Sequence, residues 1–416
     1  MNLILIGAGQ RGMIYSKYAC QLGHRITAVA EPDDDRREAA KAAFGIPEAN
    51  CYRTADELLR LPRTADAAII ATMDRDHYPQ AIPALKLGYD LLLEKPISPV
   101  PAETLSIADT ALELGRRVVI CHVLRYSPFF RKLKEILDSG ELGKIISIEH
   151  TENVGNYHIA HSFVRGNWRN EKLSSPIILQ KSCHDLDILL WLAGQSVKRI
   201  WSAGSLSFFR PENAPEGSAD RCLDCPVAGN CRFDARKAYM PTVGSWPTRV
   251  LTENQTEEGV LEALRTGPYG RCVFRCDNDV CDHQTVSMEY EDGATAVFTL
   301  SGMTDRMHRT IHIMCEHGEI RGDDDPGEIY ISRFRSGPEG IPEQRKIEIG
   351  EVEGDHNGGD IGLMRAFLGD PDGGSAVVSD ISRSVESHLL AFAAEDSRKS
   401  GQAVDMAEWT ARLRKG

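Results

Sequence analysis

The length of the chain, 416 residues, exceeds what one hydrophobic core usually serves and predicts two domains. Hydrophobic residues make up 42% and charged residues 26%, which is a globular composition rather than a disordered one. The formal net charge of −13 argues against a nucleic acid or an anionic membrane surface as the partner.

A glycine-rich turn follows the first apolar run of the chain. It consists of Gly7, Ala8, Gly9, Gln10, Arg11 and Gly12. Gly7 permits a tight turn, Gly9 lets the backbone approach a pyrophosphate, and Gly12 allows a helix to pack closely on a strand. A second strand ends near Glu31, which suits the ribose hydroxyls of NAD and would repel the 2′-phosphate of NADP. The turn therefore predicts an NAD site, and a purely structural glycine turn is the alternative.

Strand and helix patterns alternate as far as residue 122. We expect helices near 33–43, 54–60, 77–87 and 101–114, with apolar strands between them. This rhythm predicts an α/β fold with a parallel, doubly wound sheet, in which ligands bind beyond the carboxyl ends of the strands. The side chains near those ends that we expect to face the cofactor are Thr72, His77, Glu94, Lys95 and His122.

Two charges, Glu94 and Lys95, end an apolar strand pattern. A buried and unpaired charge is costly, so a pair at this place should have a use in the crevice. An ammonium group beside a carbinol oxygen stabilises the developing alkoxide and can relay its proton. A surface ion pair is the alternative.

Four motifs occur in one order along the chain: "GAGQRG", "ATMDRDHYPQAIPALKLGYDLLLEKPIS", "HVLRYSPFFRKLKEIL" and "KSCHDLDILLWLAG". Together they resemble the glucose–fructose oxidoreductase, inositol dehydrogenase and MocA-like (Gfo/Idh/MocA) family over most of the chain outside a cysteine-rich insert. The resemblance implies an N-terminal Rossmann domain and a C-terminal α+β domain with an open, largely antiparallel sheet. It also implies that Lys95 is an active-site residue and that His184 is a general base for a sugar hydroxyl.

The last motif departs from the family pattern. The family usually places an Asp four residues before the histidine, whereas this chain has Gln180, which can hydrogen-bond but cannot ionise. Lys181 follows directly. We therefore expect a proton route that differs from those of simple inositol or glucose dehydrogenases.

The patterns also predict domain limits. Residues 1–122 would form the NAD-binding domain, and 123–378 the substrate and oligomerisation domain, with the cysteine-rich insert at about 210–282. Residues 379–416 would form a C-terminal helix that packs back on the first domain.

A polar loop at 156–170 follows a strand that we expect to enter the substrate cleft. Aromatic rings and several hydrogen-bond donors are what a sugar site uses. We expect catalytic roles for His158 and His161, at least one of them, and structural histidines are the alternative. His356 belongs to a late glycine-rich motif, where a solvated turn residue is the alternative. The residues expected to contact substrate are Arg125, Tyr126, Arg165, Trp168, Gln180, Lys181, Asp187 and His356.

The insert contains a CxxC motif with a third cysteine six residues on: Cys222, Cys225 and Cys231. This spacing suits a closed metal site, whose fourth ligand would be Cys272 or Cys276. We expect a structural zinc ion, because the insert has little apolar content to bury and a metal would stabilise it. An iron–sulfur cluster and free thiols are the alternatives. We also expect the insert to shape the substrate pocket.

These features predict an NAD-dependent oxidoreductase that acts on a ring carbon of a sugar, sugar derivative or cyclitol. The alternative is a redox-neutral glycoside-cleaving enzyme, in which oxidation at C3 acidifies the neighbouring C–H, elimination expels the aglycone and the hydride then returns. A sugar sensor that kept the fold without turnover is the third possibility.

The chain shows neither a signal-peptide pattern nor an apolar run of the roughly 20 residues that span a bilayer. We therefore expect a cytoplasmic protein with no membrane or nucleic-acid partner. The resemblance implies a homodimer or homotetramer.

Overall fold

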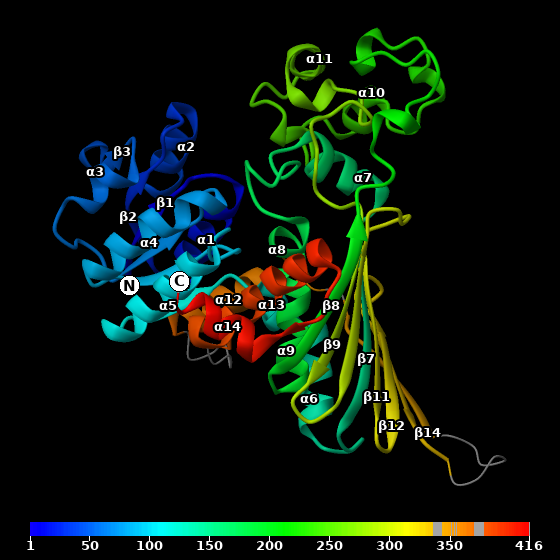
Figure 1. Ribbon diagram of the computed structural model, residues 1–416. Coiled ribbons are helices and arrows are strands. Elements are labelled where there is room, and N and C mark those ends of the chain that lie inside the picture. Colours follow the sequence, from blue (N-terminus) through cyan, green and yellow to red (C-terminus); the bar gives the residue numbers. More distant parts are fainter. Residues whose placement is uncertain (336–342, 351, 353, 355, 370–377, 416) are drawn as a thin grey trace.

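The computed structural model describes residues 1–335, 343–350, 352, 354, 356–369 and 378–415. Two β-sheets organise the molecule, and Figure 1 shows helices lying between them. Within the described residues, no helix is long and apolar enough to cross a membrane.

The first sheet has six parallel strands in the order β3-β2-β1-β4-β5-β6. The strands are β1 (Asn2–Ile6), β2 (Arg25–Ala30), β3 (Cys51–Tyr52), β4 (Ala67–Ile70), β5 (Asp90–Leu93) and β6 (Val118–Ile120). The side chains of β4 and β6 are all buried, because helices cover both faces of the sheet. The strand order reverses between β1 and β4, which is the switch point where such sheets bind ligands. The predicted Rossmann fold is confirmed.

Helices connect these strands and begin where local signals place them. The Asp33 side chain accepts a hydrogen bond from the Arg36 N–H at the start of α2, and Thr54 with Glu57 forms a capping box on α3. Gly45, with φ of 64°, ends α2 in the left-handed conformation. The helices are α1 (Gln10–Gln21), α2 (Asp34–Phe44), α3 (Ala55–Leu59), α4 (His77–Lys86) and α5 (Pro101–Glu113).

The second sheet has nine strands in the order β14-β13-β12-β11-β7-β10-β9-β8-β15. Only the β7–β10 pair is parallel among the described pairings, so the sheet is largely antiparallel, as predicted. The strands are β7 (Ile145–Asn153), β8 (Val197–Ser205), β9 (His283–Tyr290), β10 (Thr295–Ser301), β11 (His308–Cys315), β12 (Gly318–Asp323), β13 (Glu328–Arg333), β14 (Glu343–Glu348) and β15 (Val404–Asp405).

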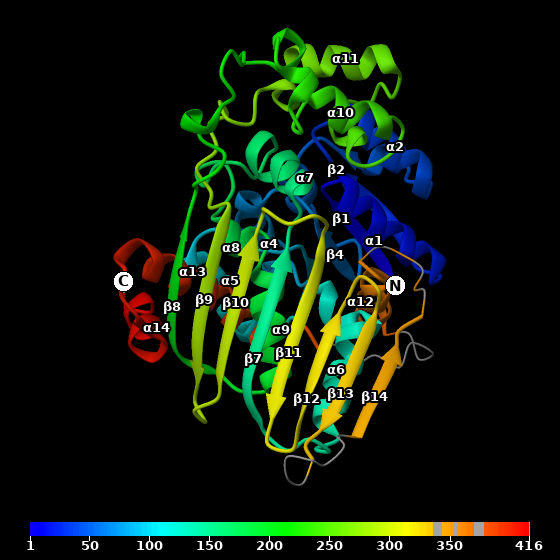
Figure 2. The same cartoon turned by 90° about the vertical axis from the view of Figure 1, so that its right-hand side faces the viewer.

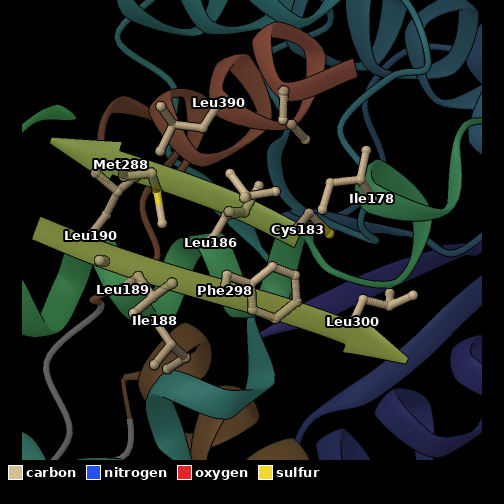
Figure 3. Packing of buried hydrophobic residues seen from close by; sticks show 14 of the residues in the cluster. Ile178, Cys183, Leu186, Ile188, Leu189, Leu190, Met288, Phe298, Leu300 and Leu390 are labelled. Atoms are coloured by element: carbon tan, nitrogen blue, oxygen red, sulfur yellow. The ribbon is translucent and has the colours of Figure 1, made fainter. Parts of the chain in front are cut away.

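One face of the second sheet carries the core, because its strands alternate buried and exposed side chains. The covering helices include α6 (Pro128–Asp138), α9 (Cys183–Ala193) and α13 (Ile381–Ser400). Figure 3 shows the packing among Leu186, Leu189, Leu190, Met288, Phe298, Leu300 and Leu390. The other face of the sheet is turned to the viewer in Figure 2, with these helices behind it.

Two late helices join parts of the chain that are distant in sequence. α12 (Gly359–Leu368) places Leu363 and Phe367 in the same core as Leu3 of β1. α13 packs against β8 and α9 and also against α5 of the first sheet, and α14 (Met406–Leu413) ends the chain. The domain limits expected from the sequence stay predictions.

The insert between β8 and β9 has a small core of its own. α10 (Ala235–Tyr239) and α11 (Glu257–Thr266) supply most of it. Figures 1 and 2 show the insert beyond one end of the second sheet, above α7 (Asn156–Ile159). The core residues are Cys222, Ala235, Tyr239, Val260, Leu264 and Tyr269.

Candidate active site

The glycine turn has no room for a side chain at two of its three glycines. A Cβ at Gly7, whose φ is 89°, would lie 2.6 Å from the Ala71 carbonyl oxygen, and one at Gly12 would lie 2.0 Å from the Gly7 carbonyl oxygen. Both positions therefore require glycine. A Cβ at Gly9 would meet no atom of the described residues within 4 Å, which leaves an open approach to the backbone.

The acid at the end of β2 reaches this turn. The Ala8 N–H donates to Glu31 Oε2 over 2.7 Å, and the Asp33 N–H donates to Oε1 over 3.1 Å. Gln10 is exposed at the first position of α1. Glu31 thus lies beside the glycine turn, as a ribose-binding acid would.

The side chains of Thr72 and His77, near the switch point, contact other groups of the protein. The Thr72 hydroxyl donates to Gln80 Oε1 over 2.7 Å. His77 is fully buried, with Nδ1 2.7 Å from the Pro96 carbonyl oxygen and Nε2 3.3 Å from the Thr72 carbonyl oxygen. Because both ring nitrogens face backbone carbonyl oxygens, His77 supports the chain beside Lys95 rather than facing a cofactor.

Glu94 belongs to a buried charge network. Its Oε1 lies 3.0 Å from Arg11 Nε and accepts from the Tyr15 hydroxyl over 2.6 Å, while its Oε2 accepts from the Lys95 N–H over 2.8 Å. Burial acts to raise the pKa of Glu94, but Arg11 and Lys95 outweigh it and the pKa lies below its usual value. The Arg11 guanidinium also pairs with Asp360. Arg11 and Glu94, both expected to contact the cofactor, neutralise each other inside the protein.

His356 adjoins this network from the late glycine-rich motif. Its Nδ1 lies 3.0 Å from Asp360 Oδ2 and 3.4 Å from Arg11 Nη1. The residue has a φ of 49°, and 45% of its side chain is exposed. His356 therefore lies at the nucleotide-domain side of the site, next to α1.

Lys95 connects the two parts of the molecule. Its Nζ donates to the Gln180 carbonyl oxygen over 2.7 Å, at the end of α8 (Ile177–Gln180). An ammonium group has three N–H donors, so this contact leaves capacity for a ligand. Gln180 itself is buried, and Lys181 Nζ lies 3.2 Å from Glu152 Oε1 of β7. The residue that replaces the family Asp therefore positions Lys95 through its backbone.

His184 lies in the first turn of α9, buried, with Nδ1 lacking a hydrogen-bond partner among the described residues. Its ring centroid is 5.7 Å from that of His122, which is fully buried. Neither ring nitrogen of His122 has a hydrogen-bond partner among the residues that the structure describes. Burial, followed by Lys95, lowers the pKa of His184 well below its usual value. Burial and then Arg125 do the same for the pKa of His122. His184 is thus neutral at neutral pH and can accept a proton.

Three residues expected to bind substrate make buried contacts between segments instead. Arg125 donates through Nε and Nη2 to the carboxylate of Asp187, over 2.6 and 2.7 Å, and through Nη1 to the Val378 carbonyl oxygen over 2.5 Å. The Tyr126 hydroxyl lies 2.9 Å from Ser379 Oγ. Burial raises the pKa of Asp187 above its usual value although Arg125 opposes it. The polar groups of these three residues therefore form hydrogen bonds within the protein.

A second charge network, which the sequence patterns did not reveal, lies beneath His184. Asp185 Oδ1 is 2.9 Å from His150 Nε2 and 2.8 Å from Arg309 Nε, and Arg309 also pairs with Glu152. Burial acts to raise the pKa of Asp185, but Arg309 and His150 hold it below the usual value. The alternation of buried and more exposed positions along β7 could have indicated this network, because His150 and Glu152 are at buried positions. Inward-facing charges in a strand require partners.

The two histidines of the polar loop have different surroundings. His158 lies on α7 with its ring centroid 5.5 Å from that of Trp246, and burial, then Lys181, lowers its pKa well below the usual value. His161 stacks on Tyr269 at 4.8 Å, its Nδ1 lies 3.0 Å from the Tyr239 hydroxyl oxygen, and burial lowers its pKa to about 4. The ring of His158 thus lies beside Trp246 and feels the charge of Lys181, whereas the ring of His161 packs on Tyr269 of the insert.

Arg165 and Trp168 also serve packing. Arg165 is buried and donates through Nε to the Arg271 carbonyl oxygen and through Nη2 to the Phe233 carbonyl oxygen, both over 2.8 Å. Nη2 is also 3.3 Å from Cys222 Sγ. Trp168 packs against the main core, with its ring 6.1 Å from Phe163. Arg165, expected to bind substrate, therefore holds the insert to the loop.

The cysteines of the insert come together only in part. Cys222, Cys225, Cys231 and Cys272 line one cavity, and the Cys276 thiol donates to the Cys272 carbonyl oxygen over 3.3 Å. Within the described residues, however, no group of three or more His, Cys, Asp or Glu side chains is arranged to hold a metal ion. The structure does not support the expected zinc site, because a tetrahedral site needs four converging ligands.

Comparison with known proteins agrees with this architecture. Residues 1–122 match the model described as the oxidoreductase family with an NAD-binding Rossmann fold, and residues 130–321 match that of the GFO/IDH/MocA C-terminal domain. YteT of Bacillus subtilis (strain 168), named as an oxidoreductase, is 25% identical over 361 residues, which cover 83% of this chain and 82% of that protein.

Two further similar proteins are named as dehydrogenases. Inositol 2-dehydrogenase of Leifsonia xyli subsp. xyli (strain CTCB07) is 29% identical over 202 residues, which cover 47% of this chain and about half, 54%, of that relative. A solved structure of levoglucosan dehydrogenase in complex with NADH superposes with a TM-score of 0.71 at 16% identity, covering 98% of this chain and 99% of that one. At such identity the likeness shows the fold alone. With both domain models matched in order, the chain belongs to the Gfo/Idh/MocA family of NAD-binding oxidoreductases.

Proposed function

We propose that the protein is an NAD-dependent dehydrogenase that moves a hydride between NAD and a ring carbon of a sugar, sugar derivative or cyclitol. The observation that carries the proposal is the 2.7 Å contact of Lys95 Nζ with the Gln180 carbonyl oxygen. It brings the ammonium group from the end of β5 to the turn that precedes His184 on α9. The names of the relatives, inositol 2-dehydrogenase and levoglucosan dehydrogenase, support a cyclic polyol as the substrate class.

The residues of the nucleotide domain fit NAD, which when bound supplies the hydride acceptor. Gly9 leaves its backbone open to the pyrophosphate, and the N-terminus of α1 offers free N–H groups and a positive dipole end. Each Glu31 oxygen accepts one backbone N–H and retains a lone pair for a ribose hydroxyl.

Lys95 and His184 divide the work at the reacting hydroxyl. As the carbinol carbon gives up its hydride and the hydroxyl its proton, the Lys95 ammonium stabilises the charge that develops on the oxygen. His184 is the group placed to accept the proton. Burial and Lys95 lower its pKa, so its imidazole is unprotonated before the reaction. The products are a ketone, the reduced cofactor and one proton.

The first test follows cofactor and products together. Purified protein is incubated with free sugars, myo-inositol and aryl glycosides, with and without NAD, while absorbance at the NADH band and aglycone release are recorded. We expect NADH to rise in proportion to one free sugar or cyclitol, to stop in Lys95→Ala, and to continue in the matched control Lys86→Ala, an exposed lysine of α4. Ligand binding without either signal would leave a sensor and contradict the proposal.

A second candidate, redox-neutral glycoside cleavage, is favoured by one observation. His158 supplies a further imidazole, just after the end of β7 where Glu152 pairs with Lys181. Burial, then Lys181 and more weakly Lys95, lower its pKa, so its ring is unprotonated. Elimination from a 3-keto sugar needs such an additional base for the C2–H proton. Aglycone release without accumulating NADH, lost in both Lys95→Ala and His158→Gln, would identify this activity instead.

We also propose that the protein forms a homodimer or homotetramer through the uncovered face of the second sheet. Large apolar side chains are exposed on its strands, including Trp201 at 41%, Val297 at 41% and Tyr330 at 46%. Apolar side chains exposed on an uncovered sheet face favour association. Sedimentation analysis of Val297→Asp against the unmodified protein tests it, and a monomeric unmodified protein would contradict it.

A further inference from the structure

One aromatic side chain of the insert lies beside the candidate catalytic residues. The ring of Trp246 stands nearly perpendicular to those of Tyr157, His158 and His161, at centroid distances of 6.1, 5.5 and 5.6 Å. The Trp246 side chain nevertheless remains 38% exposed. The insert thus brings a large apolar surface, still partly open to solvent, to the loop that carries His158.

The segment around Trp246 is held in place on both sides. The Thr242 and Thr248 hydroxyl oxygens lie 2.6 Å apart, and the buried Thr248 hydroxyl donates to the Tyr239 carbonyl oxygen over 2.8 Å. Tyr239 in turn contacts His161 through its hydroxyl at 3.0 Å. Trp246 is therefore fixed by the core of the insert and by the polar loop together, as a side chain that positions a ligand must be.

His158 ties Trp246 to the reaction site. It follows β7 on α7, three residues after Gly155, and the same end of β7 carries Glu152, which pairs with Lys181. Lys181 is adjacent to the residue whose carbonyl accepts Lys95. The low pKa of His158, caused by burial and then by Lys181, agrees with this proximity. Trp246 thus packs against a histidine whose segment follows the end of β7 that holds Lys181, the neighbour of the residue that binds Lys95.

A carbohydrate ring needs both kinds of surface. Its hydroxyl groups hydrogen-bond to charged and polar side chains, and its C–H face packs on an aromatic ring. We propose that Trp246 is a specificity-determining residue, on which the C–H face of the substrate ring packs while its hydroxyl groups turn toward Lys95 and His158. This inference rests on the proposed function and adds that the insert selects cyclic substrates.

The test compares Trp246→Ala and Trp246→Phe with the unmodified protein, using the free sugar or cyclitol that gives the fastest NADH formation. We expect KM for that compound to rise about tenfold or more in Trp246→Ala, with kcat changed less, and to return most of the way in Trp246→Phe, because an aromatic face is restored. KM for NAD and the thermal unfolding midpoint should stay unchanged. Val250→Ala is the matched control, since Val250 is an exposed apolar residue of the same insert.

Binding provides a readout besides turnover. The intrinsic tryptophan fluorescence of the NAD-loaded protein should change on addition of the same sugar, and the change should shrink in Trp246→Phe. If the sugar is turned over and Trp246→Ala matches the unmodified protein, this inference alone is overturned. If none of the sugars and cyclitols is turned over or alters the fluorescence of the unmodified protein, the proposed function and the inference fail together.

Discussion

The polar side chains at the carboxyl end of β5 and those around the cysteine-rich insert differ in how many of their hydrogen-bonding groups already have partners within the protein. At β5, Lys95 uses one N–H on the Gln180 carbonyl, and nearby His184 has an Nδ1 without a partner among the residues described. Where the polar loop meets the insert, Arg165 of the loop donates to two carbonyl oxygens and contacts a thiol of the insert, and His161 of the loop contacts Tyr239. A reactive site differs from a structural contact in having donors and acceptors without a partner in the protein. Only such groups can form hydrogen bonds to a ligand.

The largest expected effect is on activity, from a substitution at the carboxyl end of β5. Lys95→Ala should lower kcat/KM for the best substrate by about 10³-fold, because it removes the charge that stabilises the alkoxide. The thermal unfolding midpoint should fall only modestly, since the side-chain hydrogen bond that is lost is the one to the Gln180 carbonyl oxygen. Steady-state kinetics and calorimetry check both statements. A loss shared equally by Lys86→Ala would contradict the assignment.

The glycine turn offers a matched pair of substitutions. Gly12→Ala should lower the free energy of unfolding by about 1–3 kcal/mol, because its Cβ would lie 2.0 Å from the Gly7 carbonyl oxygen. Gly9→Ala should unfold like the unmodified protein, yet its Kd for NAD should rise about tenfold, since the Cβ enters the space left for the pyrophosphate. Denaturant titration and calorimetric binding measure the two effects. Unchanged NAD binding in Gly9→Ala would argue for a purely structural turn.

Arg165→Ala tests the other side of the comparison. The Arg271 and Phe233 carbonyl oxygens would lose a buried donor, which should cost about 2–4 kcal/mol of stability. Limited proteolysis should then cut within the insert, while the Kd for NAD stays unchanged. The control Arg169→Ala removes a half-exposed ion pair with Asp277 and should cost about 1 kcal/mol or less. Equal effects of the two variants would contradict a bracing role for Arg165.

The smallest expected effect is the loss of folding stability at acidic pH. Burial lowers the folded-state pKa of His161 to about 4 and that of His388 to about 3, from 6.5 in the unfolded chain. Between these values the unfolded chain binds more protons, so stability is full above pH 6.5 and falls as the pH drops below it. Unfolding at pH 7 and pH 5 should differ by about 1–2 kcal/mol more in the unmodified protein than in His161→Phe. An identical pH dependence would show that His161 is not buried as a neutral ring.

Local patterns sufficed for the first sheet. The expected helices near 77–87 and 101–114 are α4 and α5, because capping residues, glycines and apolar runs act on neighbours a few positions away. The roles in the polar loop were not predictable in this way. His158 and His161 lie three residues apart, yet Trp246 and Tyr269, both far along the chain, decide what surrounds each ring.

The sequence by itself determined the doubly wound sheet, the glycine turn and the ending of β5 in two charges, since each depends on short-range geometry and on the burial of apolar strands. Only the tertiary structure decided which charges remain available. Arg11 meets Asp360 across 349 positions of sequence, Arg165 meets Arg271 across 106, and Lys95 meets Gln180 across 85. The pairing of a buried polar group is a long-range contact, and residue type alone does not reveal which partner the fold brings to it.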